Sequence, residues 1–185
     1  ALPLITLALE MQREPAHDRS FPARRALGKL AGSWHGPVAW IPASRLLRED
    51  RPLPLFGTIA GRDLNQGRFA NCWLLAAIAS LAEFPREIER LFISYPPERP
   101  LYRVRLYHPL EERWKEVEVD EYVPCQTMAE DRFVTGWEHL AHVPLFARPR
   151  DDFWSLLVEK AVAKLIGSYE KLCSLRGNSG LAFKI

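Results

Sequence analysis

A cysteine stands at the start of an apolar run, and a glutamine lies six residues before it. Cys72 follows a stretch of small and polar residues and precedes residues 74–81, Leu-Leu-Ala-Ala-Ile-Ala-Ser-Leu. A helix that begins here would surround the thiol with unpaired backbone N–H groups and the positive end of the helix dipole, which favour the thiolate. The side-chain amide of Gln66 could then donate to the oxyanion that forms when the thiolate attacks a carbonyl. The alternative is a buried structural cysteine, the common fate of a lone cysteine.

The elements that must position these two side chains can be outlined from the residue pattern. Residues 72–81 are apolar on nearly every side, which predicts a helix buried in the centre of a domain. Residues 101–107 and 116–119 alternate in polarity, which predicts an antiparallel hairpin. Residues 153–172 contain no proline and keep helical spacing, and Asp151-Asp152 precedes them as a candidate N-cap. The predicted class is α+β, with helices dominant.

The first third of the chain differs in composition from the rest. Residues 1–60 contain seven prolines, each of which limits the length of a helix locally. We therefore expect residues 1–60 to form a proline-rich, irregular arm with one short helix near residues 23–30. Residues 61–185 are expected to form the core.

The overall composition excludes several classes of partner and of site. The net charge of +2 on 185 residues gives no reason to expect binding to nucleic acid or to a membrane surface. No apolar run is long enough for a transmembrane helix. The three cysteines, Cys72, Cys125 and Cys173, are widely spaced, which argues against a disulfide framework and a zinc site. Three widely spaced cysteines fit a protein of a reducing compartment, and we expect a cytoplasmic protein.

Three segments, in the same order, resemble the calpain-type, papain-like cysteine proteases. Residues 66–81 match that family's active-site pattern Q-G-x-x-G-D-C-W-L-L-A-A-I-A-S-L. Residues 114–124 are similar to its W-x-E-V-x-V-D-D-x-L-P strand and turn, and residues 153–170 to its E-F-W-S-x-L-L-E-K-A-Y-A-K and G-x-Y-E helix. The chain departs from the pattern at Ala70-Asn71, where the family has Gly-Asp. Asparagine removes a charge beside the thiol, which should ease thiolate formation.

The resemblance implies the first, cysteine-bearing subdomain of an intracellular, calcium-dependent-type endopeptidase that acts on protein substrates. Cys72 would be the nucleophile and Gln66 the oxyanion donor, and Trp73 and Gly177 are the positions implied for substrate binding. In the family, a histidine base and its asparagine lie in a second subdomain much farther along the chain. None of the five histidines matches that position. We therefore expect this chain to be the cysteine-bearing half of an active site, inactive until that second subdomain joins it.

The resemblance also implies a calcium site. Asp63 and Asp152 occupy the positions of the family's acidic ligands, and the backbone carbonyls of Phe56 and Thr58 fall where further oxygen ligands would be. Calcium prefers such a shell of oxygens. The other interpretations are a turn residue for Asp63 and a helix N-cap for Asp152, whose side chain is one methylene shorter than the family's glutamate. Calcium is therefore one of two open interpretations.

Two other functions remain to be weighed. A non-catalytic, calpain-like interaction or regulatory module would keep the fold without the second subdomain, and the Ala70-Asn71 departure is compatible with it. A transglutaminase-type acyltransferase also places a tryptophan after a cysteine at a helix start. The Gln66-Gly67 pair and the Phe153-Trp154 helix are not part of that pattern, so the endopeptidase is the leading hypothesis.

Overall fold

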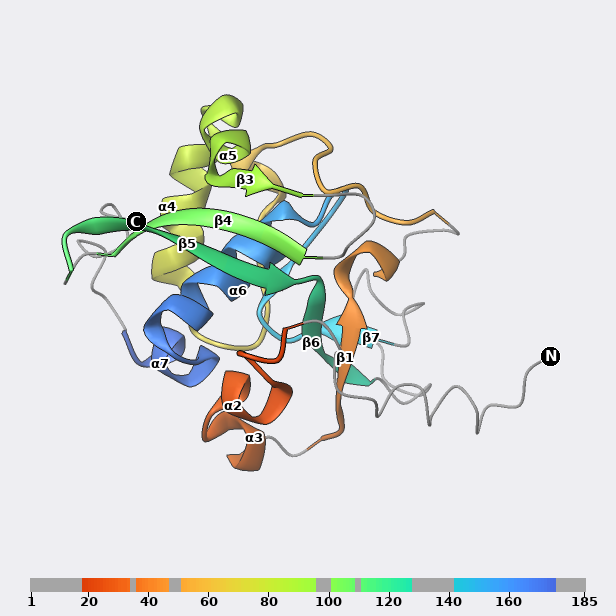
Figure 1. Ribbon diagram of the computed structural model, residues 1–185. Coiled ribbons are helices and arrows are strands. Elements are labelled where there is room, and N and C mark those ends of the chain that lie inside the picture. Colours follow the sequence, from red (N-terminus) through yellow and green to blue (C-terminus); the bar gives the residue numbers. More distant parts are fainter. Residues whose placement is uncertain are drawn as a thin grey trace.

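The structure, a computed structural model, describes residues 18–33, 36–46, 51–95, 101–108, 111–127 and 142–175. These residues form a mixed α/β fold in which helices and three small sheets pack around a long helix, α6 (Figure 1). None of the helices in these ranges is both long enough and apolar enough to cross a membrane.

The predicted hairpin is confirmed as part of a three-stranded antiparallel sheet. Its strands are β3 (Phe92–Ser94), β4 (Leu101–His108) and β5 (Arg113–Asp120), in the order β3-β4-β5. Val104 lies opposite Val117 in the β4–β5 register. The face that carries these two valines and Leu106 is buried, because α6 packs against β4 and β5 (Figure 1). The alternation in the sequence thus reflects one buried and one exposed face of the hairpin.

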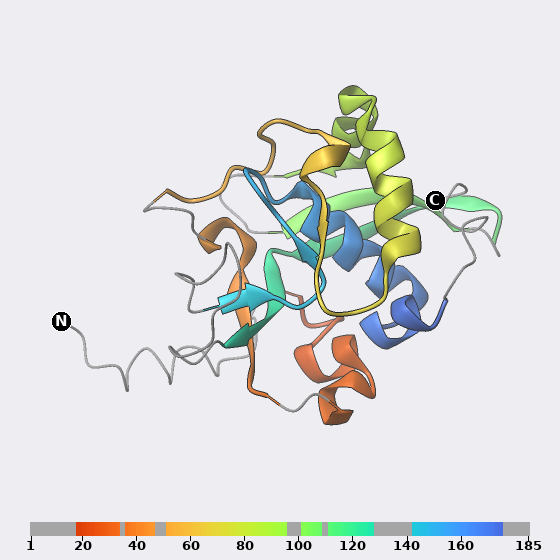
Figure 2. The ribbon, with the colours of Figure 1, turned by 180° about the vertical axis from the view of Figure 1, so that it is seen from behind.

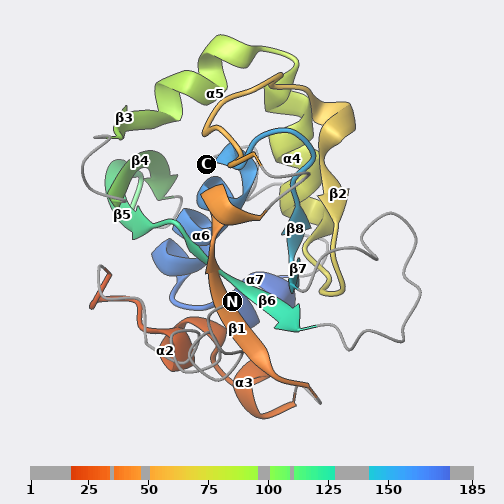
Figure 3. The ribbon, with the colours of Figure 1, turned by 90° about the vertical axis from the view of Figure 1, so that its right-hand side faces the viewer.

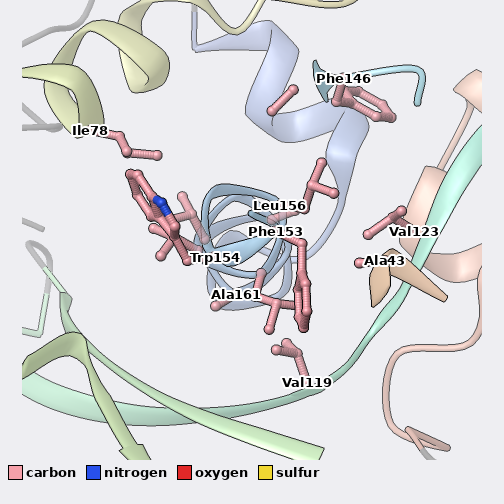
Figure 4. Packing of buried hydrophobic residues seen from close by; sticks show 14 of the residues in the cluster. Ala43, Ile78, Val119, Val123, Phe146, Phe153, Trp154, Leu156 and Ala161 are labelled. Atoms are coloured by element: carbon pink, nitrogen blue, oxygen red, sulfur yellow. The ribbon is translucent and has the colours of Figure 1, made fainter. Parts of the chain in front are cut away.

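The centre of the fold is α6 (Trp154–Ile166), in which every residue from Trp154 to Ala163 is buried. Figure 4 shows side chains from several other elements, Ile78 and Val119 among them, around this helix. The predicted helix over residues 153–172 is in fact two helices, α6 and α7 (Tyr169–Ser174). Gly167 ends α6 with φ of 109°, a left-handed conformation that glycine adopts freely. Ser168 then caps α7 by accepting from the Lys171 N–H at 3.1 Å.

The helix predicted at the cysteine is α4 (Cys72–Ala82), and it begins at the predicted residue. Its burial was predicted wrongly: Trp73, Leu74, Leu75 and Ile78 face the core, whereas Ala76 and Ser80 are exposed. Figure 2 shows α4 on the outside of the molecule. Small alanine and serine side chains tolerate either environment, so an alanine-rich run does not reveal which face is buried. α5 (Pro85–Leu91) follows and leads into β3.

The segment before residue 60 is more regular than predicted. It contains α2 (Ala23–Leu27), α3 (Leu30–Ser33), β1 (Val38–Pro42) and the short 3-10 helix η1 (Ala43–Arg45). β1 pairs antiparallel with β6 (Tyr122–Thr127), which in turn pairs with β7 (His142–Pro144). Residues 38–42 are thus a strand of a sheet rather than part of an irregular arm, while the division at residue 60 stays a prediction.

A two-stranded ribbon lies close to the start of α4. β2 (Asn65–Gln66) pairs antiparallel with β8 (Ala147–Arg148), and the two lie side by side in Figure 3. The 3-10 helix η2 (Gly61–Asp63) precedes β2 and packs against α4. β2 carries Gln66, so this ribbon and α4 together place the two residues singled out from the sequence.

Candidate active site

Cys72 is the first residue of α4, and it is exposed. Hydrogen bonding at this end of the helix begins with the N–H groups of Leu74 and Leu75, which donate to the Asn71 carbonyl at 2.9 and 3.1 Å. The N–H of Cys72 comes before them, among the backbone donors that a helix leaves unpaired at its N-terminus. The exposed thiol therefore lies at the positive end of a helix dipole, beside a backbone N–H that has no acceptor among the described residues.

Gln66 is exposed on β2, opposite Ala147 of β8. Its Nε2 donates to the Phe69 carbonyl at 3.0 Å, so the side chain folds back over the loop that leads to Cys72. A carboxamide nitrogen carries two hydrogens, and this bond uses one of them. The second hydrogen has no acceptor among the described residues.

The loop from residue 67 to residue 70 is held against the chain just before β8. The Arg68 N–H donates to the Leu145 carbonyl at 2.9 Å, and the rings of Phe69 and Phe146 stack at 4.9 Å. A Cβ on Gly67 would lie 2.0 Å from the Phe146 carbonyl oxygen, so only glycine permits this approach of two backbones. The loop joining the glutamine to the cysteine is thus fixed at several points.

Asn71 and Glu159 form a buried contact directly behind Cys72. Both side chains are at most 1% exposed, and Asn71 Nδ2 donates to Oε1 of Glu159 in α6. The Ala147 N–H donates to the same carboxyl, at 3.2 Å from Oε1 and 3.1 Å from Oε2. Burial raises the pKa of Glu159 to about 8, although these two hydrogen bonds lower it in part. Sequence reasoning missed this pair, because its members lie 88 residues apart.

Comparison with known proteins decides the family. A model of the calpain family of cysteine proteases matches residues 17–182. The chain belongs to the calpain family of cysteine proteases. It is 31% identical over 137 residues to a calpain-type cysteine protease of rice, Oryza sativa subsp. japonica, which covers 72% of the chain and 6% of that protein.

Two human calpains are similar to the same region. Calpain-9 is 30% identical over 166 residues, which covers 89% of the chain and 22% of calpain-9. Calpain-12 is 36% identical over 113 residues, which covers 58% of the chain and 14% of calpain-12. The chain therefore spans less than a quarter of the length of these relatives.

Of the two residues expected to bind substrate, the structure describes one, Trp73. Trp73 is buried, and its indole Nε1 donates to the Leu172 carbonyl of α7 at 3.1 Å. This bond fastens α4 to α7, so packing accounts for the tryptophan, and a role toward substrate stays a prediction. Gly177 lies outside the residues that the structure describes.

The acidic residues expected at a calpain calcium site do come together. Asp152 Oδ2 accepts from the Gly57 N–H at 3.1 Å, which brings this carboxyl to the loop between Phe56 and Thr58. Burial, with Asp151 and Asp63 nearby, raises the pKa of Asp152 to about 6. This carboxyl thus lies at the segment expected to supply carbonyl ligands, but the described residues contain no group of three or more acidic, histidine or cysteine side chains that could hold a metal, so calcium binding stays a prediction.

Two observations modify that site. Asp63 is already paired with Arg150, whose Nη1 lies 3.0 Å from Oδ1. Asp152 does not cap α6, because Phe153 holds the N-cap position and no side chain caps that helix. The interpretation of Asp152 as an N-cap was therefore wrong.

No histidine is bonded to Cys72 within the described ranges. His108 accepts from the Glu111 N–H at 3.1 Å at the end of β4, and His142 lies on β7. His17, His35 and His139 lie outside those ranges. Among the described residues, the candidate site therefore consists of the Cys72 thiol, which is predicted to be the nucleophile, and the predicted oxyanion donors, and no histidine bonds to the thiol.

Proposed function

We propose that the chain is the cysteine-bearing, papain-like first subdomain of a calpain-type cysteine endopeptidase that cleaves protein substrates. The observation that carries the proposal is the exposed thiol of Cys72 at the N-terminus of α4, with Gln66 on a strand tied to the same loop. A structural cysteine would be buried, as Cys125 is at 0% exposure.

In the proposed reaction, the Cys72 thiolate attacks the carbonyl carbon of a peptide bond. A carbon–sulfur bond forms, and the carbonyl π electrons move to oxygen. The oxyanion accepts from the backbone N–H of Cys72 and from Nε2 of Gln66. Collapse of this intermediate expels the amine, which takes up the proton that left the thiol, and water then hydrolyses the thioester.

The proton requires a base that these residues do not supply. We propose that a histidine, oriented by an asparagine, is provided by a second subdomain, and that the 185-residue chain alone is inactive. A thiolate without its base loses most of its rate, because members of such a triad act as a unit. The cysteines at residues 72, 125 and 173 form no disulfide among the described residues, which favours a reducing compartment such as the cytoplasm.

Calcium would be held by the carboxylates of Asp63 and Asp152 and by the carbonyls of Phe56 and Thr58. Bound there, it would neutralise two carboxylates and join residues 56–58 to the start of α6. Because η2, which carries Asp63, packs against α4, binding at this site could order the elements that carry Cys72.

The proposal is tested by assaying hydrolysis of a fluorogenic peptide by the full-length protein, with and without calcium. We expect turnover that Cys72→Ala abolishes and that Cys173→Ala, which changes a thiol on α7, retains. If the unmodified full-length protein does not hydrolyse peptides, the non-catalytic interaction module becomes the better account.

A further inference from the structure

Glu159 bonds to residues that adjoin the two parts of the proposed catalytic apparatus, and it takes no part in the chemistry itself. Its carboxyl accepts from Asn71, the residue before Cys72, and from the backbone N–H of Ala147. Ala147 is the residue on β8 that lies opposite Gln66 on β2. One buried side chain on the central helix therefore connects the start of the helix that carries Cys72 with β8, the strand that pairs with the strand of Gln66.

We propose that Glu159 is a positioning residue that sets the spacing between the Cys72 thiol and the Gln66 amide. The inference rests on the proposed function and deepens it. Loop 67–70 is fixed against residues 145–146, but those contacts do not fix the start of α4 relative to β8. Glu159 supplies that link from the wholly buried segment Trp154–Ala163.

The surroundings of Glu159 explain why a carboxyl is used here. The site presents two donors, the Asn71 amide and the Ala147 N–H, and each would be costly to bury without an acceptor. The Oδ1 atom of Asn71 is buried and has no hydrogen-bond partner among the described residues. An amide in place of the carboxyl could still accept from Ala147 and could donate to Oδ1 if the Asn71 side chain turned over. A hydrocarbon side chain could do neither.

The experiment compares Glu159→Leu, Glu159→Gln and Asn71→Ala in the full-length protein. Ser168→Ala is the matched control, because it removes a buried capping bond at α7 without touching this network. Two rates are measured for each: hydrolysis of a peptide, which needs the oxyanion donors, and alkylation of Cys72 by iodoacetamide, which needs the thiolate alone. Thermal melts establish that each variant is folded at the assay temperature.

We expect Glu159→Leu and Asn71→Ala to lower kcat by about tenfold or more, with KM and the alkylation rate within about threefold of the unmodified protein. Glu159→Gln and Ser168→Ala should keep kcat within about threefold. If Glu159→Leu does not fold, Asn71→Ala and Glu159→Gln decide the question.

The inference is overturned if Asn71→Ala hydrolyses peptide at the unmodified rate, or if Glu159→Gln loses kcat. It is also overturned if hydrolysis and alkylation decline together. If the unmodified protein hydrolyses peptide and the variants have the same kcat, only the positioning role is refuted. An unmodified protein that neither turns over peptide nor is alkylated at Cys72 refutes the proposed function as well.

Discussion

Gly67 shows how one missing side chain can decide the geometry of a site. Its backbone lies so close to residues 145–146 that a methyl group would overlap their carbonyl oxygens. The next residue, Arg68, bonds to Leu145, and Gln66 pairs with Ala147, so the whole segment is fitted to one stretch of chain. Loop 67–70 owes its shape to this contact rather than to its own conformational preference.

Replacing Gly67 with alanine should displace the loop and separate Gln66 from Cys72. Because a displacement of about 1 Å can cost on the order of a hundredfold in rate, we expect kcat/KM for peptide hydrolysis to fall by roughly that factor. The control is Gly32→Ala, since a Cβ there meets nothing within 4 Å. Equal activities of the two variants would show that the close contact does not matter for catalysis.

Arg150 bears on the proposed calcium site, because its guanidinium already neutralises Asp63. Arg150→Gln should therefore tighten calcium binding several-fold, whereas Asp152→Asn should weaken it, as measured by isothermal titration calorimetry. The raised pKa of Asp152, about 6, means that protons compete with the cation, so calcium affinity should fall as the pH drops through 6. Titrations in which neither substitution changes the affinity would place calcium elsewhere or exclude it.

Among the helices and strands, those with local signals were predicted and those that depend on distant partners were not. The start of α4 and the β4–β5 hairpin follow from neighbouring residues. The break at Gly167-Ser168 is the exception: it was not predicted, although glycine followed by serine is a common end of one helix and start of the next. β1 was missed because its pairing partner, β6, lies some eighty residues away in the sequence. The residues next to β1 give no signal of this pairing.

The candidate site also contains residues that local sequence signals reveal and contacts that depend on distant parts of the chain. Cys72 and Gln66 could be singled out from the sequence because their motif is contiguous, whereas the link through Glu159 spans three elements. The sequence pattern showed that residue 159 is a glutamate within a matched segment, but only the packing of α6 against β8 and α4 shows what it contacts. Long-range contacts of buried polar groups leave no periodic trace in a sequence.

α6 is joined to β5 by a buried ion pair between Lys160 and Asp120, each with a side chain only 1% exposed. Asp120→Asn would leave the ammonium group without its counter-charge in the core, so the free energy of unfolding should fall by about 3–5 kcal/mol. The control is Glu87→Gln, which breaks the exposed pair with Arg90 and should change stability little. Urea denaturation measures both, and similar midpoints would mean that the buried pair contributes little.

The stability of the whole domain should depend on pH through Glu159. Burial raises its pKa from 4.5 to about 8, so the folded state holds a proton that the unfolded state releases. The stability from this group is complete below pH 4.5 and is lost as the pH rises through 8, at roughly 1.4 kcal/mol per unit of pKa difference. The titratable neighbour on α7 is Tyr169, whose pKa is raised well above this window, partly by Glu159.

Glu159→Gln should therefore flatten the pH dependence of unfolding, because the amide has no proton to lose in this range. The measurement is the urea midpoint of both proteins at intervals from pH 5 to pH 8.5. Asp152, with its pKa of about 6, contributes equally to both curves and cancels in their difference. Parallel curves would show that Glu159 titrates normally.

The central claim is that the exposed thiol at the start of α4 is the nucleophile of the parent enzyme. The most direct measurement is mass spectrometry of the full-length protein after treatment with a peptidyl epoxide, which a thiolate opens to form a stable thioether. The account predicts a single adduct on Cys72, with Cys125 and Cys173 unmodified and no adduct after Cys72→Ala. An adduct on another cysteine, or none on Cys72, would contradict it.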